Sequence, residues 1–133
     1  MPRENKTRSY ATPIIRTIGK REQIILCGDK SVASYDPANG KRHWIIDGPT
    51  EQFVASMVYN GKYAFVTGGY PERHILAIRP EGSGNITETH IAWRVKKGAS
   101  YVPSPVVVGP YFVIAADNGI ASCFKAEDGT RLW

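Results

Sequence analysis

The stretch SYDPANGKRHW at residues 34–44 decides the fold, because it returns in altered form as CFKAEDGTRLW at residues 123–133. The two stretches align without a gap. Each begins with a small residue and an aromatic one, carries Asn or Asp before a glycine, and places a tryptophan four residues after that glycine. Asn39-Gly40 tolerates the positive φ angles of a tight hairpin. Each stretch is therefore predicted to form two strands joined by a turn.

A looser copy lies between these two. It keeps a small residue at Ala77, an apolar residue at Ile78 and a tryptophan at Trp93, with a polar insertion before the tryptophan. The three tryptophans are at positions 44, 93 and 133, so their separations are 49 and 40 residues. Repeats of this length are typical of the blades of a β-propeller.

The rest of the chain is predicted to be short strands. Apolar and β-branched segments alternate with Gly, Pro and Asn turns, and no segment has helical spacing through three turns. We therefore expect an all-β fold with three four-stranded antiparallel blades of a β-propeller in one domain. The predicted boundaries are an N-terminal tail at 1–11 and blades at 12–47, 55–96 and 103–133.

The pattern of a small residue, a turn with Asp and Gly, and a tryptophan resembles the tryptophan-docking motif of the PQQ-like (quinoprotein alcohol dehydrogenase-like) β-propellers. The resemblance covers nearly the whole chain from Ala11 onward. The motif aspartate is present as Asp36 but is replaced by Arg79 and Lys125 in the other two units. In that family the tryptophan packs against the turn of the neighbouring blade. The resemblance implies that the blade-docking residues are Ser34, Gly40, Trp44, Ala77, Trp93, Cys123, Gly129 and Trp133.

Three blades make an open arc, whereas propellers close with about 4–8 blades. Two apolar blade faces would then be uncovered, and such surfaces mark interaction sites. Either the chain is a fragment of a longer protein, or a second copy completes a six-bladed ring as a homo-oligomer. The sequence leaves both alternatives open.

Composition excludes several classes of protein. Apolar residues make up 42% and charged residues 22% of the 133 residues, so the chain is neither disordered nor fibrous. The net charge of +5 comes from scattered Lys and Arg, which does not favour nucleic acid as a partner. No run is apolar enough for a membrane span. The resemblance implies a periplasmic or secreted protein, although the sequence shows no signal peptide.

The sequence contains no recognisable catalytic constellation. Cys27 and Cys123 are predicted to pack as buried small hydrophobes, with a long-range disulfide left open. His74 and His90 would be cross-strand neighbours in the second unit, but no further ligand completes a metal site. We therefore predict no catalytic, metal or cofactor-binding residue. The longest loops are the candidate binding surfaces, and they offer Tyr70, Arg73 and Arg79.

These observations favour a non-catalytic repeat module that binds or scaffolds another protein. A second hypothesis is a part of a dehydrogenase that uses PQQ and Ca²⁺, but the adjacent-cysteine disulfide of those enzymes has no counterpart here. A third is a purely structural half-propeller that assembles with itself.

Overall fold

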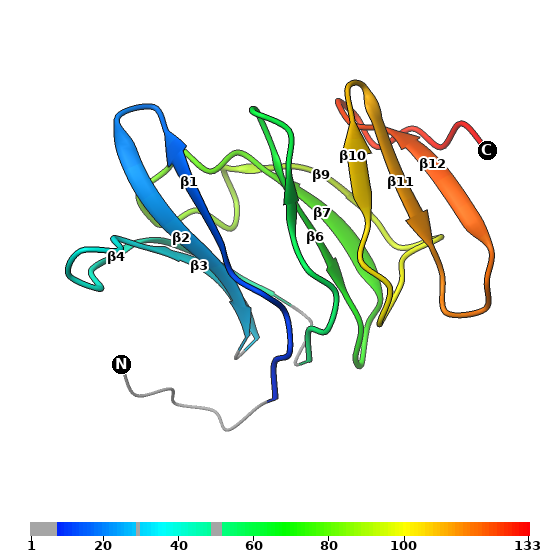
Figure 1. The fold of residues 1–133 in the computed structure, drawn as a ribbon, viewed down its shortest axis with the longest axis horizontal. Coiled ribbons are helices and arrows are strands. Elements are labelled where there is room, and N and C mark those ends of the chain that lie inside the picture. The colour runs from blue at the N-terminus through cyan, green and yellow to red at the C-terminus, as the bar shows by residue number, and fades with distance from the viewer. Residues whose placement is uncertain (1–7, 29, 49–51) are drawn as a thin grey trace.

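The computed structural model describes residues 8–28, 30–48 and 52–133, and the regular structure within them is entirely β-strand. The strands form three sheets. Figure 1 shows the sheets side by side like sectors of a disk, with the first and third at the two sides of the array. The prediction of an all-β partial propeller is confirmed, and each sheet is called a blade from here on.

Each blade is an antiparallel meander in chain order. Blade 1 contains β1 (Ile14–Ile18), β2 (Arg21–Gly28), β3 (Ser31–Tyr35) and β4 (Arg42–Asp47). Blade 2 contains β5 (Val58–Tyr59), β6 (Ala64–Gly68), β7 (His74–Ile78) and β9 (Ile91–Val95). Blade 3 contains β10 (Val106–Val108), β11 (Tyr111–Ala115) and β12 (Ala121–Lys125).

Two details differ from three uniform four-stranded blades. The short strand β8 (Gly84–Asn85), inside the insertion of the second unit, pairs in parallel with β4 and adds a fifth strand to blade 1. In blade 3 the fourth strand is reduced to a single antiparallel bridge between Phe124 and Arg131.

The strands of blade 2 separate two apolar cores. Every residue of β6 and β7 is buried, because successive side chains point to opposite faces and both faces are covered. Val66 and Leu76 belong to the core shared with blade 1, whereas Phe65 and Ile75 belong to the core shared with blade 3. Adjacent blades therefore bury each other's faces, and a blade with only one neighbour keeps one face uncovered.

Within the described residues, no helix has the length and apolar character that crossing a membrane requires.

Candidate functional site

The joint between blades 1 and 2 contains a buried polar cluster around Trp44. The indole Nε1 of Trp44 donates to Oε1 of Gln23 and to the carbonyl oxygen of Pro80, both at 2.9 Å. Ser34 Oγ donates to the same Gln23 oxygen at 2.6 Å, and Gln23 Nε2 donates to the Pro80 carbonyl at 3.0 Å. Pro80 lies just after β7, so these bonds join blade 1 to the turn region of blade 2. Each buried polar atom in the cluster has a partner, as stability requires.

The joint between blades 2 and 3 is aromatic. Trp93 Nε1 donates to the carbonyl oxygen of Ala126 at 3.0 Å. The ring lies directly over Gly129, where a Cβ atom would stand 2.8 Å from Trp93 Cδ2 and Cε3. Gly129 also has a φ of +73°, so this turn needs glycine both for its backbone and for the close approach of the ring. Phe65 and Phe112 complete the contact, with ring centroids 5.2 Å apart.

A second set of contacts crosses the same joint at the surface. Lys62 Nζ and Glu127 Oε1 lie 2.7 Å apart, and the hydroxyl of Tyr63 donates to that oxygen at 3.2 Å. Because Lys62 and Glu127 are exposed, this ion pair adds little to the free energy of unfolding. The buried Trp93 ring therefore contributes more to the stability of this joint than the ion pair does.

The small residues of the repeat sit beside the tryptophans. Ser34 is the antiparallel partner of Trp44, and Ala77 is the antiparallel partner of Trp93. In blade 3 the amide of Cys123 donates to the carbonyl oxygen of Trp133 at 3.0 Å. The three units therefore share one register in the structure. Trp133 differs from the other two tryptophans in being 60% exposed, whereas Trp44 is 0% and Trp93 is 8% exposed.

The turns at residues 36–41 and 125–130 have the same hydrogen bonds. In each, the first amide donates to the carbonyl oxygen five residues on, and the glycine amide donates back to the carbonyl oxygen four residues earlier. These bonds are Asp36 N to Lys41 O (2.8 Å), Gly40 N to Asp36 O (2.9 Å), Lys125 N to Thr130 O (2.8 Å) and Gly129 N to Lys125 O (2.9 Å). Only the second turn is covered, because Gly129 is buried while Gly40 is exposed.

The candidate binding residues in the loops do not form one surface. Tyr70 and Arg73 precede β7, whereas Arg79 follows it, so they lie at opposite ends of that strand. Tyr70 is 56% exposed, and Arg79 Nη2 donates to the carbonyl oxygen of Thr89 at 3.0 Å. The loop around Arg79 also packs against blade 1, because Ile86 is 2% exposed and its amide donates to the carbonyl oxygen of Ile45 at 2.9 Å.

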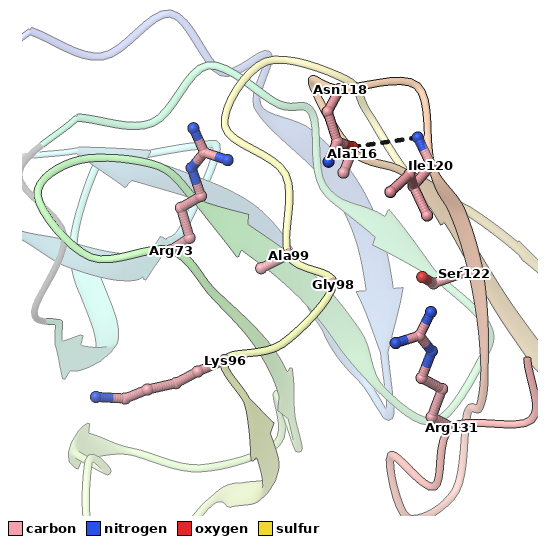
Figure 2. A pocket seen from close by; sticks show the side chains of 9 residues that line it. All are labelled: Arg73, Lys96, Gly98, Ala99, Ala116, Asn118, Ile120, Ser122 and Arg131. Carbon is pink, nitrogen blue, oxygen red and sulfur yellow. Dashed lines mark hydrogen bonds between the residues drawn. The ribbon is translucent and has the colours of Figure 1, made fainter.

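A pocket of about 350 Å³ lies between the end of β9 and β12 and includes Arg73, Lys96 and Arg131 in its lining. Two of these cations already have carboxylate partners: Arg73 lies 3.5 Å from Asp117, and Lys96 lies 3.2 Å from Glu72. Figure 2 shows the Arg73 and Lys96 side chains pointing in different directions, not converging on one point. The pocket therefore does not present a concentrated positive charge.

His74 is a buried titratable side chain at the start of β7. His74 is 1% exposed, and burial together with the nearby charge of Arg94 lowers its pKa to about 4. The expectation that His74 and His90 are cross-strand neighbours is wrong. Because β7 and β9 are antiparallel, the start of β7 lies beside the end of β9, while His90 precedes the start of β9. Among the described residues, no three His, Cys, Asp or Glu side chains are grouped to hold a metal ion.

The two cysteines lie in different blades, Cys27 in β2 and Cys123 in β12, and both are free and buried. Burial raises the pKa of the Cys27 thiol, which keeps it protonated and unreactive. The long-range disulfide that the sequence left open is therefore absent.

Comparison with known proteins identifies the fold. No protein-family model and no curated protein matches the chain. Among solved structures, a quinohemoprotein alcohol dehydrogenase of Pseudomonas putida HK5 aligns with a TM-score of 0.72 and 18% identity, over 96% of this chain and 20% of its own. The quinohemoprotein alcohol dehydrogenase of Comamonas testosteroni aligns with a TM-score of 0.70 and 16% identity, over 96% of this chain and 21% of its own. BamB from Moraxella catarrhalis aligns with a TM-score of 0.66 and 11% identity, over 90% of this chain and 34% of its own.

At these identities the likeness concerns the fold alone. The described part of the chain has the β-propeller fold of these proteins, as a partial disk. It spans between a fifth and about a third of the length of the proteins it superimposes on.

Proposed function

We propose that this chain is a non-catalytic propeller module that works by binding protein through the uncovered faces of its end blades. The observation that carries the proposal is the apolar face of blade 3. Val106, Val108 and Tyr111 point to the side of blade 3 that faces away from blade 2, and they are 56%, 65% and 50% exposed. Trp133 adds a fourth large apolar side chain, 60% exposed.

A surface of this kind favours a protein partner. Exposed aromatic and branched side chains grouped on one face are typical of interaction sites. Quinohemoprotein alcohol dehydrogenases and BamB share the fold, so the fold by itself does not select catalysis. The proposal therefore follows from the surface and not from the resemblance.

The alternative is that the chain forms part of a PQQ- and Ca²⁺-dependent dehydrogenase, and the alcohol dehydrogenases among the structural neighbours favour it. The described residues do not fit this cofactor set. Calcium needs six to eight oxygen ligands, and no cluster of carboxylates is present among the described residues. Cys27 and Cys123 also lie in different blades, so they cannot form an adjacent-cysteine disulfide.

Two measurements test the proposal. A photo-crosslinking amino acid at Val108 is expected to capture protein, while the same group at Asn60, on an exposed turn of blade 2, is not. Capture at neither position would contradict protein binding through this face. Calorimetric titration with PQQ and Ca²⁺ is expected to give no heat of binding. Micromolar binding would overturn the non-catalytic assignment and favour the alternative.

A further inference from the structure

We propose that the uncovered face of blade 3 docks on blade 1 of a second copy of this chain. In this joint Trp133 donates its indole N–H to the carbonyl oxygen of Pro37 and lays its ring over Gly40. The inference rests on the proposed function, because it names the protein partner and the contact that the exposed face makes.

The donor side is set by register. Trp133 lies beside Cys123, since the Cys123 amide donates to Trp133 O at 3.0 Å and the Leu132 amide donates to Cys123 O at 2.8 Å. Trp93 has the same position relative to Ala77. Its indole crosses to the next blade, so an indole at Trp133 is placed to cross in the same direction.

The acceptor side is the turn of blade 1. The small residue of each unit stands three positions before the carbonyl that accepts the indole: Ala77 before Pro80, and Cys123 before Ala126. The same count from Ser34 leads to Pro37. The glycine of this turn, Gly40, has a φ of +70° against +73° at Gly129, and no atom lies within 4 Å of the place where its Cβ would be. The turn therefore has the form that receives Trp93 at Gly129, without a tryptophan over it.

The faces around this contact are both apolar. On blade 1, Ile15 and Ile24 are antiparallel partners on the side away from blade 2, and Leu26 and Tyr35 share that side. Ile15 is 53% exposed and the other three are half-buried. On blade 3 the corresponding face presents Val106, Val108 and Tyr111. Burying these faces against each other would continue the packing already present between neighbouring blades.

A second copy of this chain supplies both halves of the contact, because Trp133 is an exposed donor and the turn at Gly40 is an uncovered acceptor of the same kind of joint. A two-fold axis would pair each Trp133 with the other copy's turn and close the arc. Two sets of three blades make six, which lies within the closed range of about 4–8 blades. At the position of the Lys62–Glu127 ion pair, the proposed joint has no charged side chain. Lys62 corresponds to Pro110 in blade 3, and Glu127 corresponds to Ala38 in blade 1.

Sedimentation equilibrium of the full chain at roughly 1–200 µM tests the inference. The wild type is expected to reach about twice the chain mass of 14.7 kDa. Trp133→Ala is expected to raise the dissociation constant by at least about 30-fold, as loss of a central interface tryptophan does. Gly40→Ala is expected to do the same, since its Cβ would meet the incoming ring. The matched control is Gly61→Ala, which has a φ of +94° and open surroundings but lies in blade 2.

Mixing the two defective variants gives a sharper readout. Trp133 of the Gly40→Ala chain still meets an intact Gly40 on the Trp133→Ala chain, so the mixture is expected to form a heterodimer that neither variant forms alone. Acrylamide quenching reports the same event, since only one of the three tryptophans is exposed in a single chain. Folding of each variant is checked by its circular dichroism spectrum and urea midpoint.

A wild type that stays monomeric at 200 µM, the upper end of this range, would overturn the inference, and so would a dimer that survives both substitutions. Neither result decides the proposed function, because crosslinking at Val108 to a different protein and the absence of PQQ binding would still support it. Capture of no protein at Val108 together with micromolar PQQ binding would remove the proposed function as well.

Discussion

Replacing Gly129 by alanine separates the two roles of that glycine. The first role is backbone conformation: φ is +73°, and an L-residue in this region costs about 1 kcal/mol or more. The second is space, because the new Cβ would lie 2.8 Å from two ring atoms of Trp93 and 3.2 Å from Val95 Cγ2. The Trp93 ring is only 8% exposed and packs against Phe65 and Phe112, so it has little room to retreat.

Overpacking of a tight core site costs about 1–3 kcal/mol, so Gly129→Ala should lower the free energy of unfolding by about 2–4 kcal/mol in total. Gly119→Ala is the matched control in the same blade. Its φ is +81° and nothing lies within 4 Å of its added Cβ, so only the backbone cost of about 1 kcal/mol applies.

Urea unfolding of both variants at one protein concentration measures the difference. With an m-value of about 2 kcal/mol/M, the extra loss in Gly129→Ala should lower the midpoint by about 0.5–1.5 M relative to the control. Equal midpoints would refute the reasoning, because they would mean that the Trp93 ring accommodates the added Cβ without any loss in the free energy of unfolding.

Three further outcomes are expected. Gln23→Leu should lower the free energy of unfolding by about 2 kcal/mol, because the buried Ser34 hydroxyl loses its acceptor. The double variant with Ser34→Ala should recover part of that loss, as measured by urea unfolding. His74 has a folded pKa of about 4 against 6.5 in the unfolded chain, so it takes up a proton on unfolding below about pH 7. The free energy of unfolding should therefore be nearly constant above about pH 7 and about 2 kcal/mol lower at pH 5. The variant His74→Gln should show a flatter pH profile in thermal unfolding. Asp117→Ala should raise the amide exchange rate of Tyr101, because its 2.9 Å acceptor is lost, while leaving β6 protected.

The fold could be predicted from the sequence because its signal is periodic. The tryptophans, the small residues paired with them and the turn glycines recur at one register, and each strand between them is bounded by turn residues. Such a pattern reports on the blade as a unit, so the predicted architecture does not depend on where a single strand such as β5 (Val58–Tyr59) begins or ends. The same pattern does not reveal what covers the outer faces, because β11 (YFVIA) is as apolar as β7 (HILAI), although only β7 is buried on both faces.

Two features of the joints were not predicted, and each has a physical reason. Gln23 holds the buried cluster around Trp44, but a glutamine at the start of an apolar strand looks like a solvent-facing residue. Its spacing from Ile25 and Cys27, two and four residues on, was the available signal, since residues two apart share one face of a strand. The pairing of β8 with β4 was also missed. A polar insertion gives no local sign of a long-range backbone contact. Ile86 is the one buried aliphatic side chain that anchors the insertion in the core.

The insertion that carries β8 also explains why the two joints differ. At the first joint the insertion places Gly84 beside Trp44 as a parallel strand partner, and the indole N–H donates to Gln23 of its own blade and to the Pro80 carbonyl. At the second joint the compact turn leaves its glycine free to receive the ring, and no side-chain acceptor is needed. The turn at residues 36–41 has no insertion and repeats the hydrogen bonds of the compact turn. A tryptophan that docks there should therefore make the aromatic kind of joint, with Gly40 under its ring. The polar kind of joint would require a side-chain acceptor such as Gln23 in the blade that carries the tryptophan, and blade 3 has Tyr111 at that position.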